Sequence, residues 1–181
     1  LTGRFITFEG GEGAGKTTQI KLLAASLEDA GHKVLLTREP GGTPEAEKLR
    51  DLVLKDPSCE LDDREIALLV TAARANHVRQ IIGPALRDGK IVLCDRFADS
   101  TLVYQGYAGG LGFEAIEALQ RWALGDLWPD LTFYFDLDPE SGLMRTNQRV
   151  DGQQRFEGYD LSFHHRLREG FQELARRYPD R

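Results

Sequence analysis

The sequence is poor in cysteine, methionine and tryptophan, and it contains no long hydrophobic run. Its 181 residues include two cysteines, one methionine and two tryptophans. Cys59 and Cys94 are too few for a disulfide framework and lack metal-ligand spacing, so they fit a reducing, cytoplasmic location. The longest apolar stretch, Ile66 to Ala73, is far shorter than the roughly 20 residues that span a bilayer. We therefore expect no membrane segment and no disulfide-rich secreted fold.

Positive charge is also in short supply. The chain has 23 Lys+Arg against 29 Asp+Glu, a formal net charge of −6. Proteins that bind duplex nucleic acid neutralise its phosphates with many basic residues, so we expect no nucleic-acid partner. An anionic ligand would instead need a local cluster of donors. The chain opens on Leu1 without a signal peptide or an initiator methionine, and we expect that its true start precedes the numbered sequence.

Hydrophobic runs alternate with helical stretches along the whole chain. This alternation predicts an α/β protein with a doubly wound parallel sheet flanked by helices. The length fits one domain, residues 1–181, able to fold on its own hydrophobic core. We expect strands at 5–9, 33–37, 91–95 and 131–137, and a glycine-rich loop at 106–112. Helices are expected at 15–30, from Pro44, from 61 to Gly89 with a break near Gly83 and Pro84, at 113–124, from Pro139 to about 149, and up to about Tyr178.

The most specific motif is Gly10-Gly11-Glu12-Gly13-Ala14-Gly15-Lys16-Thr17, followed by Thr18. It fits G-x-x-x-x-G-K-[ST] between a predicted strand and a predicted helix, which predicts a P-loop NTPase fold. Backbone N–H groups and the helix N-terminus would hold ATP phosphates, Lys16 would reach the β- and γ-phosphates, and Thr17 could ligate Mg²⁺. A merely flexible glycine turn would not explain Lys-Thr at this offset, and no register fits the dinucleotide pattern G-x-G-x-x-G.

Asp95 and Arg96 follow the third predicted strand. An acid at the carboxyl end of a strand beside the P-loop strand is typical of a Walker-B carboxylate that holds Mg²⁺. Arg96 adds a bidentate donor suited to phosphate. Asp136 and Asp138 are competing candidates for the metal carboxylate, ranked lower because a helix start at Pro139 follows at once.

Several other charged residues fall near predicted strand ends or in a polar segment. Glu9 ends the first strand, where a role near the substrate and a salt bridge to Arg38 or Arg96 are both open. Any one arginine is ordinarily a solvated surface residue, but their grouping favours a phosphate clamp or lid. The further members of this group are Arg74, Arg145, Arg149 and Arg155.

The histidines and cysteines give no comparable signal. His32, His77, His164 and His165 show no ligand spacing, and we expect surface or partly buried roles for them. We expect Cys94 to be a small buried residue of a strand and Cys59 to be a thiol in a loop.

The chain resembles the bacterial thymidylate kinases, a family of P-loop nucleoside monophosphate kinases. The resemblance spans essentially the whole chain. It is carried by FEGGEGAGKTTQ (8–19), LLTREPGGTP (35–44), the segment ending in AAR at Arg74, DRFADSTLVYQG (95–106) and RTNQRVDGQQRFE (145–157). The pair TREPGG and DR-x-x-x-S-x-x-x-Y-Q-G makes the resemblance specific.

The resemblance implies transfer of the ATP γ-phosphoryl group to dTMP with Mg²⁺, by a homodimer. It implies that Lys16 and the P-loop amides hold ATP, that Thr17 and Asp95 surround Mg²⁺, and that Arg96 grips the acceptor phosphate. It places Arg74 at the thymine carbonyl edge and Glu9 near the sugar 3′-hydroxyl and the metal, and Tyr104 would crowd a ribose 2′-hydroxyl. The remaining acceptor-site residues are Arg38, Ser100, Thr101 and Gln105.

Because the P-loop lacks arginine, the resemblance implies that the catalytic arginine lies in a lid at about 145–160. Arg149 and Arg155 are the candidates, with Arg145 a weaker third. Two features depart from the family pattern. Val70 stands where a thymine-stacking phenylalanine is common. The chain also stops before the usual last strand and helix, so either these are missing or the sheet is shorter; we expect the former, because an exposed strand edge would otherwise remain.

Two other functions remain open at this point. One is a different small P-loop kinase, such as a deoxynucleoside kinase. The other is a nucleotide-dependent switch protein, which lacks support because no N-K-x-D motif occurs.

Overall fold

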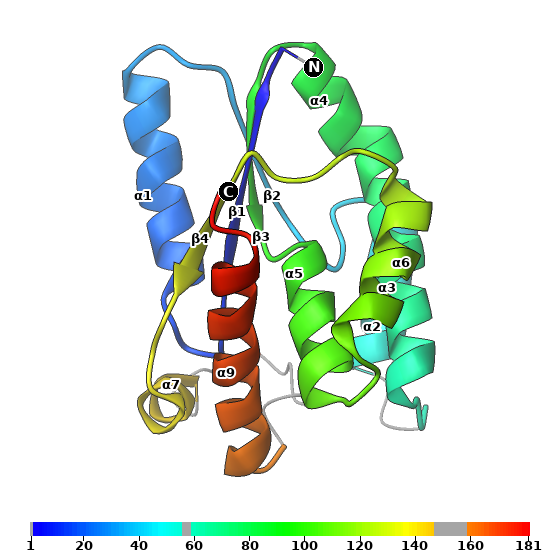
Figure 1. The fold of residues 1–181 in the computed structure, drawn as a ribbon. Coiled ribbons are helices and arrows are strands. Elements are labelled where there is room, and N and C mark those ends of the chain that lie inside the picture. The colour runs from blue at the N-terminus through cyan, green and yellow to red at the C-terminus, as the bar shows by residue number, and fades with distance from the viewer. Residues whose placement is uncertain (1, 56–58, 147–158) are drawn as a thin grey trace.

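A parallel sheet of four strands forms the centre of the molecule (Figure 1). The structure is a computed structural model that describes residues 2–55, 59–146 and 159–181. The strands are β1 (Arg4–Gly10), β2 (Val34–Arg38), β3 (Ile91–Asp95) and β4 (Leu131–Phe135), in the order β2-β3-β1-β4. β1 pairs with β3 and β4, and β2 with β3, all in parallel. The predicted α/β class is therefore confirmed.

Helices cover both faces of this sheet, with α1 (Lys16–Asp29) on one side and α3 (Asp63–His77), α4 (Gly83–Arg87) and α6 (Phe113–Leu124) on the other (Figure 1). Successive side chains of β1 point to opposite faces. Phe8 packs with Ile20 of α1, whereas Phe5 packs with Leu86 of α4. Because both faces are covered, the inner strand β3 is apolar on both sides from Ile91 to Cys94.

The remaining helices follow the strand ends or pack on the helices already described. α2 begins at Pro44 behind the N-cap Thr43, and α3 opens with a capping box in which Asp62 and Glu65 bond each other's backbone N–H. An apolar cluster that includes Tyr104, Phe163 and Phe171 joins the helices after β3 to the last helix. These elements are α2 (Pro44–Leu54), α5 (Ala98–Thr101), η2 (Leu102–Ala108), α7 (Pro139–Thr146) and α9 (Leu161–Arg177).

The predicted helix break at Gly83 and Pro84 is wrong. Helical structure continues from α3 through a π-helical turn, η1 (Val78–Ile82), into α4, which ends at Arg87. Pro84 lacks an N–H and would crowd a regular turn. In the wider turn the Gly83 N–H bonds the Val78 carbonyl, five residues back, so the proline is accommodated.

The glycine-rich loop predicted at 106–112 is shorter than expected. Gly106 lies inside η2, a π-helical segment, and the loop begins only after Ala108. The Gly112 N–H bonds the Gly106 carbonyl at 2.8 Å, and a Cβ on Gly106 would sit 3.3 Å from the Gly112 carbonyl oxygen. The glycine thus serves close packing of two backbone segments rather than a loop.

The strand register brings the polar strand ends together. Phe8 and Arg38 both pair with Asp95 in register, so the ends of β1, β2 and β3 meet at one edge of the sheet. The P-loop leaves β1 at this edge. In parallel α/β sheets ligands bind outside the carboxyl ends of the strands.

Candidate active site

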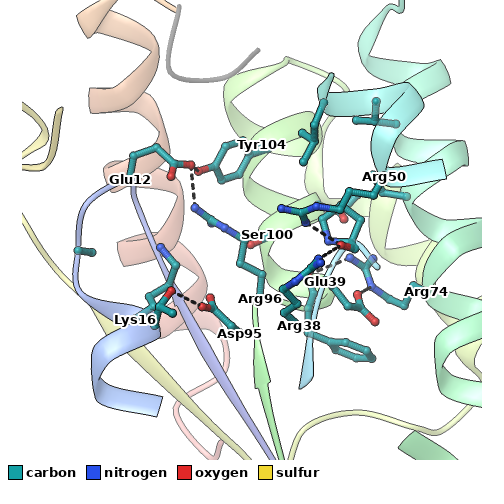
Figure 2. Close-up of a pocket in the computed structure, with 18 of the residues that line it drawn as sticks. Glu12, Lys16, Arg38, Glu39, Arg50, Arg74, Asp95, Arg96, Ser100 and Tyr104 are labelled. Carbon is teal, nitrogen blue, oxygen red and sulfur yellow. Dashed lines mark hydrogen bonds and ion pairs between the residues drawn. The ribbon is translucent and has the colours of Figure 1, made fainter. Parts of the chain in front are cut away.

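A cavity of about 380 Å³ opens at the carboxyl edge of the sheet. Figure 2 shows Glu12, Lys16 and Asp95 on one side of it and Arg38, Arg50 and Arg74 on the other, with Arg96 between them. The cavity is therefore charged at both ends, and its two ends come from different elements.

The P-loop wraps from β1 into the N-terminus of α1. Gly13 has a φ of 66°, and a Cβ there would collide with the Gly142 carbonyl of α7, so only glycine fits. Lys16 begins α1 and is 7% exposed. Its Nζ donates to the carbonyl oxygens of Gly10 at 3.1 Å and Gly11 at 2.7 Å. Burial, together with the nearby Arg96 charge, lowers the pKa of Lys16 to about 8.

Thr17 and Asp95 meet beside this loop, as the sequence predicted. The Thr17 hydroxyl donates to Asp95 Oδ2 at 2.8 Å. Both supply oxygen atoms, the ligand type that Mg²⁺ prefers. The competing acids lie elsewhere, since Asp136 pairs with Arg168 at 2.6 Å and Asp138 accepts from the backbone N–H of Ser141.

Arg96 occupies the middle of the cavity in a conformation uncommon for a side-chain-bearing residue, with a φ of 67°. Its guanidinium donates to the Gly10 carbonyl at 3.0 Å and to Glu12 Oε1 at 2.8 Å, and it lies 5.2 Å from the Tyr104 ring centre. The Tyr104 hydroxyl donates to the same Glu12 oxygen at 2.7 Å. Burial alone would raise the pKa of Glu12, but Arg96 and Lys16 outweigh it and lower that pKa to about 2. A permanent carboxylate thus holds Arg96 in place.

Glu9 lies behind the cavity wall rather than on it. It is 1% exposed and accepts from the Phe97 N–H at 2.7 Å and the Ser100 hydroxyl at 2.6 Å. Burial, with the neighbouring Asp99 carboxylate, raises the pKa of Glu9 to about 7. Among the described residues, no ion pair joins Glu9 to Arg38 or Arg96, the pairing that the sequence left open. Its contacts instead fix the start of α5.

Arg74 is buried at the far end of the cavity, where it pairs with a residue that was not predicted from the sequence. Its Nε donates to Glu39 at 2.6 Å, with both side chains 2% exposed or less. Arg50, also missed, donates to the Pro40 carbonyl at 2.7 Å, and Arg38 donates to the same oxygen at 3.1 Å. Glu39, Arg50 and the cis bond before Pro40 belong to the REPGGT turn and the helix after it.

An aliphatic wall closes the cavity beside Arg74. Val53 and Leu54 of α2 face Ile66 and Val70 of α3. Val70 is 8% exposed and lies on this wall, at the position where the sequence lacked an aromatic residue. The wall is apolar but carries no ring.

The structure brings most of the predicted site residues to the cavity. Ser100, Thr101, Tyr104 and Gln105 line it from α5 and η2. Gly10, Gly11 and Thr18 do not line it, and Thr18 is exposed on α1. Arg149, Arg155 and most of the predicted lid lie outside the described residues. Arg145 points its guanidinium at the Gly13 carbonyl, 3.5 Å away.

The histidine prediction is wrong for two positions. His77 and His164 are 0% and 4% exposed, whereas His32 is exposed and His165 half-buried. His77 tolerates burial because both its ring nitrogens have polar partners. Cys94 is buried in β3 as predicted, and Cys59 is half-buried.

Two further properties concern metals and membranes. In the described ranges, no three His, Cys, Asp or Glu side chains group into a metal centre. Across the same ranges, no helix combines the length and the apolar character needed to cross a bilayer.

Three features define the class of this protein: the P-loop after β1, the acid Asp95 at the end of the neighbouring strand β3, and the arginines at the other end of the cavity. They are the features of a P-loop enzyme that binds a nucleotide and a second substrate. A family model described as thymidylate kinase matches residues 8–181. The chain belongs to the thymidylate kinase family, which is a family of nucleoside monophosphate kinases.

Individual relatives are similar along the whole chain. The thymidylate kinase of Magnetococcus marinus is 51% identical over 183 residues, covering 100% of this chain and 86% of that protein. That of Caulobacter vibrioides is 50% identical over 179 residues, covering 99% and 86%. The crystal structure of thymidylate kinase from Ehrlichia chaffeensis superposes with a TM-score of 0.83 at 39% identity, covering 100% of this chain and 91% of that one.

Proposed function

We propose that this chain transfers the γ-phosphoryl group of ATP to the 5′-phosphate of dTMP, giving dTDP and ADP. The observation that carries this proposal is a cavity with the P-loop and Lys16 at one end, Arg74 at the other and Arg96 between them. Phosphoryl transfer needs two phosphate sites in line, with positive charge where they meet. A switch protein that hydrolyses its nucleotide needs no second substrate end.

At the donor end, the P-loop amides and Lys16 would hold the ATP phosphates. Thr17 and Asp95 already lie within hydrogen-bond distance of each other, and their oxygens would hold Mg²⁺ beside the phosphates. When bound, the ion neutralises phosphate charge during the transfer. Lys16 must then exchange its two carbonyl acceptors for phosphate oxygens, which keep its ammonium charged.

At the acceptor end, Arg96 would bind the dTMP phosphate. A guanidinium carries five N–H groups, and the described bonds of Arg96 to Gly10, Ser100 and Glu12 use three of them, so donors remain for a phosphate. Arg74 would meet the thymine carbonyl edge, and Tyr104, fixed by Glu12, would crowd a 2′-hydroxyl. Glu9 would act through Ser100 and the Phe97 backbone as a positioning residue.

The same proposal includes closure of a lid at about 145–160, with Arg149 or Arg155 supplying positive charge at the transferred group. Closure would also exclude water and limit wasteful hydrolysis of ATP. A cytoplasmic location follows from the donor, since ATP is a metabolite of the cell interior.

We further propose a homodimer formed through helices. Large apolar side chains are exposed on two adjacent helices (Figure 1): Leu68 of α3 is 57% exposed and Trp122 of α6 is 87% exposed. Contiguous exposed apolar surface marks protein interfaces, and the proposal places these two helices in the contact. Sedimentation equilibrium tests the proposal, and a concentration-independent monomer would contradict it.

The decisive test of the function is an ADP-release assay with a panel of acceptors: dTMP, dUMP, dCMP, dGMP and thymidine. We expect turnover on dTMP well above the other acceptors. Turnover on thymidine but not on dTMP would instead identify a deoxynucleoside kinase, and ADP release independent of acceptor would favour a switch protein.

A further inference from the structure

His77 is buried behind the cavity, and both of its ring nitrogens are engaged. It ends α3, is 0% exposed and does not line the cavity itself. Its Nδ1 lies 3.0 Å from Glu39 Oε1, and its Nε2 lies 2.8 Å from the Thr37 hydroxyl of β2. A buried histidine with two specific partners, three residues beyond Arg74, is more than a space-filling residue.

The chemistry of the partners sets the direction of these hydrogen bonds. A carboxylate only accepts, so Nδ1 carries the proton and donates to Glu39. In a neutral ring Nε2 then accepts from the Thr37 hydroxyl. The other Glu39 oxygen, Oε2, accepts from Arg74 Nε at 2.6 Å. Thr37, His77, Glu39 and Arg74 therefore form one hydrogen-bonded chain from the sheet to the cavity, in which His77 and Arg74 both donate to Glu39.

Arg74 is held at three nitrogens. Besides Glu39 on Nε, Nη1 donates to Gln120 at 2.7 Å and Nη2 donates to the Phe97 carbonyl at 3.0 Å. A guanidinium carries five N–H groups, so two remain. Because Arg74 lines the cavity, the direction of those two donors depends on the three fixed bonds. Glu39 is the charged acceptor among the three.

The turn after β2 is shaped around the histidine ring. Gly42 has a φ of 90°, and a Cβ there would overlap the His77 ring. The neighbouring Thr43, the N-cap of α2, donates to Asn76 at 2.7 Å. The ring therefore fixes the turn that carries Glu39 relative to α3, which carries Arg74.

We propose that His77 is a positioning residue for recognition of the acceptor base, acting through Glu39 to aim the free donors of Arg74. The proposal rests on the function above, which places Arg74 against the base. Correctly aimed N–H donors favour a base with a carbonyl at position 4, as in dTMP, over one with an amino group there, as in dCMP. If the donors are misaligned, this preference is lost, because they no longer hydrogen-bond well to the carbonyl oxygen at position 4.

Two substitutions at His77 separate its two hydrogen bonds. His77→Gln places an amide near Nε2, keeping the Thr37 contact and losing the Glu39 contact. His77→Asn places an amide nitrogen near Nδ1 and keeps a donor to Glu39. Thr37→Val removes the hydroxyl that orients the ring at nearly unchanged volume. Thr7→Val is the matched control, since Thr7 is a buried strand threonine whose described hydroxyl bond is to Thr132, at 2.9 Å, and not to His77, Glu39 or Arg74.

The measurements are kcat and KM for dTMP, dCMP and ATP, with a thermal unfolding curve for each variant. For His77→Gln we expect KM for dTMP to rise about tenfold and the preference for dTMP over dCMP, in kcat/KM, to fall about tenfold, with KM for ATP within about twofold. His77→Asn should recover most of the preference. Thr37→Val should lose part of it, and Thr7→Val none.

The proposal is overturned if folded His77→Gln lowers kcat/KM equally for dTMP and dCMP, or changes neither. If His77→Gln does not fold, Thr37→Val decides by the same ratio, and an unchanged ratio overturns the proposal. Failure of the proposed function has a different signature, because wild-type protein would then not phosphorylate dTMP at all.

Discussion

At the scale of single residues, Lys16 couples the site to pH. Burial lowers its pKa to about 8, so its ammonium is progressively lost as pH rises through 8. Bound triphosphate adds negative charge and favours the ammonium, which moves the loss to higher pH. We predict that kcat/KM for ATP falls above about pH 8, whereas kcat falls only at higher pH.

Steady-state kinetics from pH 6 to pH 10.5 test this prediction. The Lys16→Arg variant serves as control, because a guanidinium stays charged over this range and its residual activity should lack the fall near pH 8. If kcat and kcat/KM for ATP fell at the same pH in the wild-type protein, this prediction would be wrong.

Val70 offers a gain-of-affinity prediction. It lies on the aliphatic wall of the cavity, where a phenylalanine ring could stack on a pyrimidine. An aromatic pair contributes roughly 0.5–1.5 kcal/mol beyond area burial, so Val70→Phe should lower KM for dTMP by about two- to tenfold. Val70→Leu, which adds volume without a ring, is the control. An unchanged KM would mean that another residue does this work.

Residues within one local motif were predictable, and those joined only by folding were not. The P-loop with Thr17, and Asp95 with Arg96, are each recognisable at the end of a strand, and the parallel sheet then brings Thr17 and Asp95 together. Glu39 gains its role from Arg74, which is 35 positions away in the sequence, and no local pattern reports that pairing. The two buried hydrogen bonds of Glu9, from the Phe97 N–H and the Ser100 hydroxyl, join it to residues 88 and 91 positions away, which no local pattern reports either.

At the scale of elements, α3 depends on its capping box. The Asp62 side chain accepts from the Glu65 N–H at 2.8 Å. Asp62→Ala leaves that N–H without its cap, and we predict a loss of about 1 kcal/mol in the free energy of unfolding. Asp62→Asn keeps a capping oxygen and should cost much less. Urea denaturation measures both, and equal stability of the alanine variant and the wild type would contradict the prediction.

The predicted lid supplies the second prediction at this scale. Arg149 and Arg155 lie outside the described residues, so their role rests on the sequence and on the absence of arginine from the P-loop. Arg149→Ala or Arg155→Ala should lower kcat on the order of 10²-fold with little change in KM for ATP. Arg145→Ala, in α7, should have a smaller effect. If neither Arg149→Ala nor Arg155→Ala lowers kcat, the lid assignment is wrong.

Element boundaries were predictable where a proline or glycine begins or ends its own segment without help from neighbouring elements. β3 and α6 begin and end where the sequence placed them, and Pro44 starts α2 as expected. Pro84 and Gly106 were read as breaks, but wider helical turns accommodate both. Whether a helix ends or widens depends on what packs beside it, and that information is not local.

At the scale of the whole molecule, the sequence predicted a doubly wound parallel sheet but not its order. The order β2-β3-β1-β4 depends on pairing between strands distant in sequence. This order puts Arg38, Asp95 and the P-loop at one edge, so arginines gather at the cavity although the formal net charge is −6. Local concentration of positive charge, rather than the overall field, is what the proposed chemistry uses.

In the proposed reaction, the γ-phosphoryl group of ATP passes to dTMP in this cavity. The most direct measurement follows radioactive label from [γ-³²P]ATP in a single turnover with dTMP, separating dTDP from inorganic phosphate. The account predicts that label appears in dTDP at the rate at which ADP forms. Label in inorganic phosphate alone, with dTMP unchanged, would contradict it.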